Sequence, residues 1–352
     1  MVDEEIRARR LRGLERLGQL YFDRYLSEPT IILSEVRHNW WASLKFCFDR
    51  SFERGRRGAL SERYRKHTTK TLAVAFGLES ALPAIEGLRS RVAEFNIDTV
   101  ENHIQTLSTK AACDCASLTQ DRPETLLERL CPHFGSHEPH FLKHNADIPL
   151  NLKTDLRMVA GFLRMAATIN GSPDITIFGA LEKKMRERGL DAAWEVLAGI
   201  PGVKQKISRL IVRDVYLLTR DSDHDSISPV DDDWQYGFPV DTWVEQMADR
   251  LLDVKQRTKE SYDRFYSRIR DEFIIAARGL NLNPCLIAAG LWYLGVCPSN
   301  PFLPVRATGY HATNEHNRLW HRPKALILGY SDRLLGANSR EIALGCIDGC
   351  HV

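Results

Sequence analysis

Residues 199–210 read GIPGVKQKISRL, in which a proline–glycine pair separates two stretches with helical periodicity. A helix that ends at Ala198 and restarts at Lys204 would be joined by a hairpin of about five residues, 199–203. Glycine allows the backbone a tight turn, and the second helix begins with amide groups that have no acceptor inside the helix. Because helix N-termini bind anions, the stretch predicts either an ordinary connection in a helical core or a phosphate site beside a reactive amine.

Helical periodicity extends over most of the chain on both sides of this stretch. Apolar residues recur three and four positions apart in 4–26, whereas the run 40–52 is apolar on most sides. These patterns predict a surface helix and a buried core helix. Period-two alternation is nearly absent, and only ALILGY at 325–330 resembles a strand. The predicted fold class is all-α, with further helices expected over 68–110 (two or three), 153–168, 175–189 and 283–297.

The composition excludes several classes of protein. Among 352 residues, 48 Lys and Arg face 46 Asp and Glu, so the net charge of +2 gives no global attraction for a polyanion. Any nucleic-acid surface must therefore be local. No run of about 18 apolar residues is present to span a bilayer, and the first residues are charged throughout. Eight scattered cysteines favour reduced thiols. We expect a soluble, cytoplasmic protein without a cofactor.

A second motif, FPVDTWVEQMADRLL, occupies residues 238–252. Asp241 stands where a helix begins, so its carboxylate either caps that helix or points from the first turn into a cleft. The preceding stretch, 220–238, is acidic and has no periodicity, which predicts a long connecting loop.

Together these two motifs resemble the helix-hairpin-helix superfamily of DNA glycosylases, which includes endonuclease III and 8-oxoguanine glycosylase. Their signature is a hairpin of the form LPGVGxK followed by PVDTHV, and this chain has IPGVKQK at 200–206 and PVDTWV at 239–244. By this resemblance Lys206 occupies the position of the nucleophilic lysine of bifunctional members, and Asp241 that of their invariant carboxylate. Lys204 stands where the family has a second glycine. The iron–sulfur cysteine quartet of some members is not reproduced, so no cluster is expected.

The resemblance covers roughly residues 1–300 and implies a two-lobed architecture. One helical lobe would comprise 36–219 and contain the hairpin, and the other would combine 1–35 with 239–352, linked by the acidic loop. The active site would lie in the cleft between them. The helix at 283–297 resembles the family's late helix, and 40–52 resembles the helix that precedes its DNA-inserting loop. We expect a monomer.

The implied function is excision of a damaged or enzymatically modified base from double-stranded DNA, in base excision repair near the nucleoid or in restriction of phage DNA. A carboxylate at Asp241 would stabilise positive charge on the deoxyribose, and Lys206 would form a Schiff base. The neighbouring Lys204 and the helix dipole both favour a neutral amine. A monofunctional glycosylase and a non-catalytic DNA-binding module remain alternatives.

Further residues are assigned to DNA by the same resemblance. The predicted DNA contacts are Gly199, Pro201, Gly202, Val203, Lys204, Arg209, Arg50 and Arg54. Aromatic side chains that could stack on an everted base, although core packing competes for each, are Trp41, Trp243 and Trp292.

One cluster of cysteine and histidine could suggest a metal. The segment CPHFGSHEPHFLKH, residues 131–144, would need three or four of its side chains to converge on one ion, and no paired C-x2-C accompanies them. We expect a polar loop and no metal.

Overall fold

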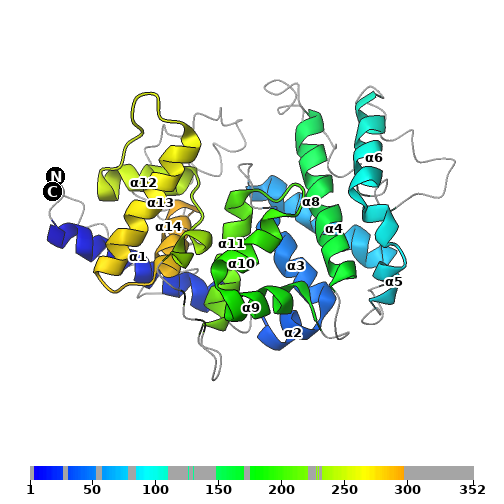
Figure 1. Cartoon of the computed structure of the whole chain (residues 1–352), viewed down its shortest axis with the longest axis horizontal. Helices are drawn as coiled ribbons and strands as arrows, with labels where there is room; N and C mark the ends of the chain where they lie inside the picture. The colour runs from blue at the N-terminus through cyan, green and yellow to red at the C-terminus, as the bar shows by residue number, and fades with distance from the viewer. Residues whose placement is uncertain are drawn as a thin grey trace, which may run out of the picture. The chain divides into compact units, whose positions relative to one another are not determined.

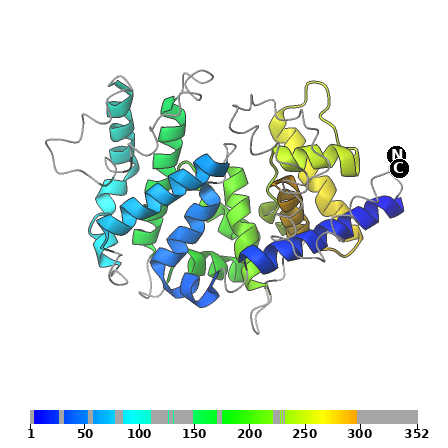
Figure 2. The ribbon, with the colours of Figure 1, turned by 180° about the vertical axis from the view of Figure 1, so that it is seen from behind.

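The computed structural model describes residues 4–26, 31–52, 58–77, 85–109, 126, 130, 148–169, 175–220, 227, 229 and 232–296 (Figures 1 and 2). Every regular element in these ranges is helical, with 13 α-helices and no strand, which confirms the all-α class. The possible strand at 325–330 lies outside the described residues. Contacts divide the chain into two compact units, which we call unit 1 (1–30 with 229–352) and unit 2 (31–228).

Unit 2 is built around the helix predicted to be buried, which spans Trp40–Ser51. Asn39 starts this helix by accepting hydrogen bonds from the amides of Trp41 and Ala42, at 2.9 and 3.1 Å. The helices of unit 2 are α2 (Leu33–His38), α3 (Trp40–Ser51), α4 (Gly58–Ala75), α5 (Glu86–Arg89), α6 (Ile97–Thr109), α8 (Ile148–Thr168), α9 (Ile177–Arg188), α10 (Leu190–Ala198) and α11 (Gln205–Thr219), with a 3₁₀ turn at Val92–Phe95.

Helix α3 contacts five other helices of its unit, namely α2, α4, α8, α9 and α11 (Figure 1). Phe46, Cys47 and Phe48 are all 3% exposed or less, so successive residues, and not one stripe, are buried. A helix surrounded by others must be apolar on most sides, which is the pattern the sequence displays.

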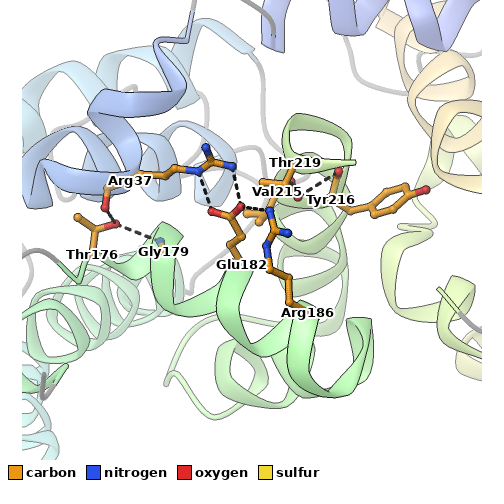
Figure 3. Close-up of polar contacts among 8 residues, drawn as sticks. All are labelled: Arg37, Thr176, Gly179, Glu182, Arg186, Val215, Tyr216 and Thr219. Carbon is orange, nitrogen blue, oxygen red and sulfur yellow. Dashed lines mark hydrogen bonds and ion pairs between the residues drawn. The ribbon is translucent and has the colours of Figure 1, made fainter. Parts of the chain in front are cut away.

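Polar side chains join α2 to α9 within unit 2 (Figure 3). Glu182 accepts hydrogen bonds from Arg37 at 2.6 and 2.8 Å and from Arg186 at 2.8 Å. The hydroxyl of Thr176 accepts from the Gly179 amide at 3.1 Å and lies 3.1 Å from the Arg37 carbonyl oxygen, so it caps α9 and contacts the end of α2 at once. These contacts position the short helix α2, which has little capacity to be stable alone.

Unit 1 centres on α14, which contacts α1, α12 and α13. The close pair α1 and α14 can be followed in Figure 2. Two glycines allow that approach: a Cβ on Gly18 would lie 1.9 Å from the Leu286 carbonyl oxygen, and one on Gly290 would lie 2.0 Å from that of Leu14. The helices of unit 1 are α1 (Glu4–Tyr21), a π-helix (Phe22–Leu26), a 3₁₀ helix η4 (Asp233–Gly237), α12 (Thr242–Leu252), α13 (Tyr262–Gly279) and α14 (Pro284–Val296).

Part of the stretch predicted as a long loop, 220–238, is helical, since η4 spans Asp233–Gly237. This short helix packs on α13 and α14, and Phe238, which follows it, is fully buried and stacks on Phe273 with ring centroids 5.8 Å apart. The aromatic residues of WQYGF (234–238) were the available signal, since apolar rings favour packing over a solvated loop.

Candidate functional site

The connection between α10 and α11 follows the predicted boundaries, since α10 ends at Ala198 and α11 begins at Gln205. Residues 200–203 form a β-turn in which the Val203 amide donates to the Ile200 carbonyl at 3.0 Å. Pro201 occupies the second position and Gly202 the third, with φ of +82°. These are the features of a type II turn, in which the third residue takes a positive φ.

This turn is held against α8. A Cβ on Gly202 would lie 2.5 Å from the Thr154 carbonyl oxygen, and one on Gly161 would lie 2.4 Å from Cγ2 of Ile200. Ile200 and Val203 are 7% and 6% exposed, so both apolar residues of the turn are anchored in unit 2. The start of α11 is therefore held in place by close packing of the turn against α8.

Two of the cations predicted to contact DNA, Lys204 and Arg209, lie near this helix start. Lys204 is exposed and serves as the N-cap position of α11, with φ of −90° and ψ of 168°. This extended conformation suits any residue, so lysine fits where the resembled family has glycine. Lys206 is half-buried in the first turn of α11. Arg209, one turn later, donates a hydrogen bond from Nη1 to Oε1 of Gln205 at 2.9 Å, and its guanidinium lies 5.8 Å from the centroid of the Trp194 ring.

Asp241 caps α12, as one of the two predicted roles requires. Its Oδ1 accepts from the Val244 amide at 3.2 Å, and its carbonyl accepts from the Glu245 amide at 2.8 Å. The segment before it is anchored, because Phe238 and Val240 are buried. The half-buried Asp241 carboxylate is thus held at the helix N-terminus, where the helix dipole favours a negative charge.

A neighbouring contact was not found by sequence reasoning. Tyr266 of α13 donates a hydrogen bond from its hydroxyl to Oε2 of Glu245 at 2.9 Å. Burial raises the pKa of Tyr266, and the hydrogen bond to Glu245 and the charges of Glu245 and Asp241 raise it further. The only available signal was the four-residue spacing of Asp241 and Glu245, which places both on one helix face.

Arg50, predicted to contact DNA, is instead buried inside unit 2. It is 8% exposed; its Nε donates to Asp214 at 3.0 Å and its Nη1 to the Phe46 carbonyl at 3.1 Å. The guanidinium also lies 3.6 Å from the centroid of the Phe46 ring. Arg50 therefore links α3 to α11 inside unit 2, and this placement does not support a DNA contact. Arg54 lies outside the described residues.

Of the tryptophans predicted to form a base pocket, Trp41 and Trp292 each pack on an aromatic neighbour within their own unit. Trp41 of unit 2 packs edge-on against Trp40, with ring centroids 6.0 Å apart. Trp292 of unit 1 packs edge-on against Tyr21 at 5.5 Å. The side chain of Trp243 lies outside the described part. An open hollow of about 440 Å³ runs along α13 from Glu260 to Ile275, and neither Trp41 nor Trp292 lines it.

Neither a metal-ligand cluster nor a membrane-spanning helix occurs in the part of the chain that the structure describes. There, no three His, Cys, Asp or Glu side chains lie close enough together to hold a metal ion, and no helix is long and apolar enough to cross a bilayer. The cysteine- and histidine-rich segment 131–144 lies outside that part. Two buried thiols are described, Cys47 and Cys285, and burial raises the pKa of Cys47 to about 12.

Comparison with known proteins adds no assignment: no protein-family model, no curated protein and no solved structure matches this chain.

Proposed function

We propose that this protein is a DNA glycosylase that everts and excises a damaged or modified base from duplex DNA, with an associated abasic-site lyase activity. The observation that carries the proposal is local. A tight glycine turn leads into a helix whose first turn bears Lys206, and a second helix begins with the carboxylate of Asp241. These are the two structures that the resembled motifs require, in the same order along the chain.

The turn at 199–204 would bind a phosphate of the DNA. Helix N-termini present amide groups toward anions, and the dipole of α11 adds to that attraction. Lys204 is exposed at the N-cap, where its ammonium can reach the same phosphate. In this proposal 190–219 acts as a helix-hairpin-helix motif that fixes the position of the strand, and the base is recognised elsewhere.

In base excision Asp241 and Lys206 would have separate roles on the same nucleotide. The bond between C1′ and the base nitrogen breaks, its electron pair leaves with the base, and positive charge develops on the sugar. The Asp241 carboxylate would stabilise that charge. The Lys206 amine would then form a bond to C1′ and lose a proton. The C1′–O4′ bond would break, with its electron pair and a proton going to O4′, to give an imine at C1′. Loss of a proton from C2′ would then expel the 3′ phosphate.

The test is a panel of duplexes with oxidised, alkylated and glucosylated bases, read by mass spectrometry of released bases and by borohydride trapping. Asp241→Asn keeps a good capping oxygen but removes the charge, so we expect base release to stop while the melting temperature is unchanged. Lys206→Gln should abolish trapping, and the control Lys204→Gln should keep it.

Other outcomes would select the alternatives. Base release without a trapped adduct, at wild-type rate in Lys206→Gln, would make the protein a monofunctional glycosylase. DNA binding with no release from any duplex of the panel would contradict the enzymatic proposal and favour a non-catalytic DNA-binding module.

A further inference from the structure

Glu245 and Tyr266 form a hydrogen-bonded pair beside Asp241 within unit 1. Glu245 follows Asp241 by four positions, so the two carboxylates share one face at the start of α12. The Tyr266 hydroxyl lies 2.9 Å from Glu245 Oε2, and the negative charge of Asp241 also raises the pKa of Tyr266. All three side chains are half-buried. One phenol therefore lies close to two carboxylates.

The hydrogen-bond donor to Glu245 is neutral, in contrast to the partners of Glu260 and Asp249 in the same unit. Glu260 is paired with the Arg268 guanidinium at 2.7 Å, and Asp249 with the Lys255 ammonium at 3.3 Å. Among the described residues no cation lies within ion-pair distance of Glu245. A neutral donor orients a carboxylate and leaves its charge in place, whereas an ion pair orients the carboxylate and also cancels its charge.

The phenol is suited to this task at neutral pH. Burial and the nearby carboxylates raise the pKa of Tyr266, so its hydroxyl stays protonated and remains a donor. Tyr266 is itself held by aromatic contacts, with Tyr262 at 6.0 Å and Phe265 at 6.2 Å between ring centroids. The Glu245 carboxylate is thus held in place by a neutral donor that is itself fixed by aromatic packing.

We propose that Glu245 is a second carboxylate of the Asp241 site, oriented by Tyr266, and that it adds negative potential where the deoxyribose becomes positive during base excision. The inference rests on the proposed glycosylase function. Neither residue exchanges a proton or forms a bond: the C1′–N electron pair still leaves with the base, and the new bond to C1′ still comes from Lys206 or water. Glu245 acts through its charge, and Tyr266 is a positioning residue.

The test compares base excision with DNA binding in Glu245→Gln, which keeps the shape and an oxygen that accepts from Tyr266. We expect the single-turnover excision rate to fall by about tenfold. Affinity for an undamaged duplex should stay equal or become tighter, because a negative charge near the phosphates has been removed. A purely structural role for Glu245 would weaken both together. The matched control is Asp249→Asn on the same helix, whose charge is already balanced by Lys255. This variant should change neither the excision rate nor the affinity for DNA.

A double-mutant cycle tests the role of Tyr266. Tyr266→Phe should slow excision in the wild-type background but have no further effect in Glu245→Gln, because the hydroxyl acts only through that carboxylate. Tyr262→Phe, one turn earlier on α13, is the matched control and should keep the wild-type rate.

The outcomes separate this inference from the function on which it rests. If the wild type releases a base and Glu245→Gln releases it equally fast, the inference is wrong and the glycosylase proposal stands. Equal slowing by Tyr266→Phe in both backgrounds would overturn the positioning role. If the wild type releases no base from any duplex, both proposals are overturned together.

Discussion

Gly202 is the residue at which the α10–α11 connection depends most on the absence of a side chain. Its φ of +82° lies in the left-handed region, and a Cβ would meet the Thr154 carbonyl at 2.5 Å and the Met158 amide at 2.8 Å. Alanine in that conformation costs about 1–2 kcal/mol before any clash is counted. We expect Gly202→Ala to lower the free energy of unfolding of unit 2 by at least that amount, measured by urea denaturation.

Gly199 provides the matched control three residues earlier. Its φ is −73°, and a Cβ there would lie 3.6 Å from its nearest neighbours, which is ordinary contact. Gly199→Ala should therefore leave stability within about 0.5 kcal/mol of wild type. Equal losses in the two variants would show that the turn itself is not the constraint.

Asp214 is the residue that compensates two buried guanidinium groups in unit 2. Its Oδ2 accepts from Arg50 at 3.0 Å and its Oδ1 lies 2.8 Å from Nη2 of Arg213, whose side chain is fully buried. Asp214→Asn removes the charge and leaves both cations buried, a loss of about 3–5 kcal/mol for a broken buried pair. Thermal and urea unfolding should both report it.

An exposed ion pair of the same unit is the comparison for that prediction. Lys183 and Glu187 of α9 lie 3.8 Å apart with side chains 66% and 47% exposed. Glu187→Gln should change the free energy of unfolding by no more than about 0.5 kcal/mol. A small effect of Asp214→Asn, comparable to this one, would contradict the structural role given to the Arg50–Asp214 pair.

At the scale of elements, the packing of α1 on α14 depends on two glycines, one on each helix. A Cβ on Gly290 would lie 2.0 Å from the Leu14 carbonyl oxygen, so Gly290→Ala must push the helices apart. We expect a loss of about 1–3 kcal/mol, the usual cost of overpacking, although alanine is the better helix former. Gly279→Ala, where nothing lies within 4 Å, should be neutral or stabilising. Differential scanning calorimetry should show a lower melting temperature for Gly290→Ala and an equal or higher one for Gly279→Ala.

Element boundaries were largely predictable, whereas contacts between elements were not. The proline–glycine pair at 201–202 and the apolar run of α3 determine local structure through rules that act over a few residues, and both predictions are confirmed. Gly290 lies in the predicted helix 283–297, but nothing in that segment indicates that it packs against Leu14, which is far away in the sequence. Arg50 illustrates the same limit: the resemblance assigned it to DNA, and its charge is instead paired with Asp214, 164 positions later.

In the candidate site too, one residue was predictable from local sequence and another was not. That Asp241 would begin a helix followed from its position in PVDTWV, because Asp is a common N-cap. The hydroxyl that approaches Glu245 comes from Tyr266 of another helix, 21 positions later, and no local pattern pairs them. Residues whose role depends on one helix can be read from sequence, and residues whose role depends on how two helices pack require the structure.

At the scale of the whole molecule, the charge balance limits how the proposed DNA binding could arise. With 48 cations against 46 anions the protein has no overall field to attract a polyanion, so affinity must arise from a few local contacts. Each phosphate neutralised contributes about −0.9 to the slope of log K against log salt concentration. We expect the salt dependence of DNA binding to have a small total slope, and one lysine at the proposed phosphate site should contribute a measurable part of that slope.

Lys204, exposed at the start of α11, is the residue for which this can be measured. Fluorescence anisotropy of a labelled duplex over a range of potassium chloride concentrations should give a slope for Lys204→Ala that is smaller in magnitude by about 1, with weaker binding at low salt on every sequence. Lys183→Ala removes an equal charge from α9, where Glu187 already pairs with it, and should leave the slope unchanged. If both variants shift the slope equally, DNA responds to net charge alone, and the phosphate site at the α10–α11 turn would have to be abandoned.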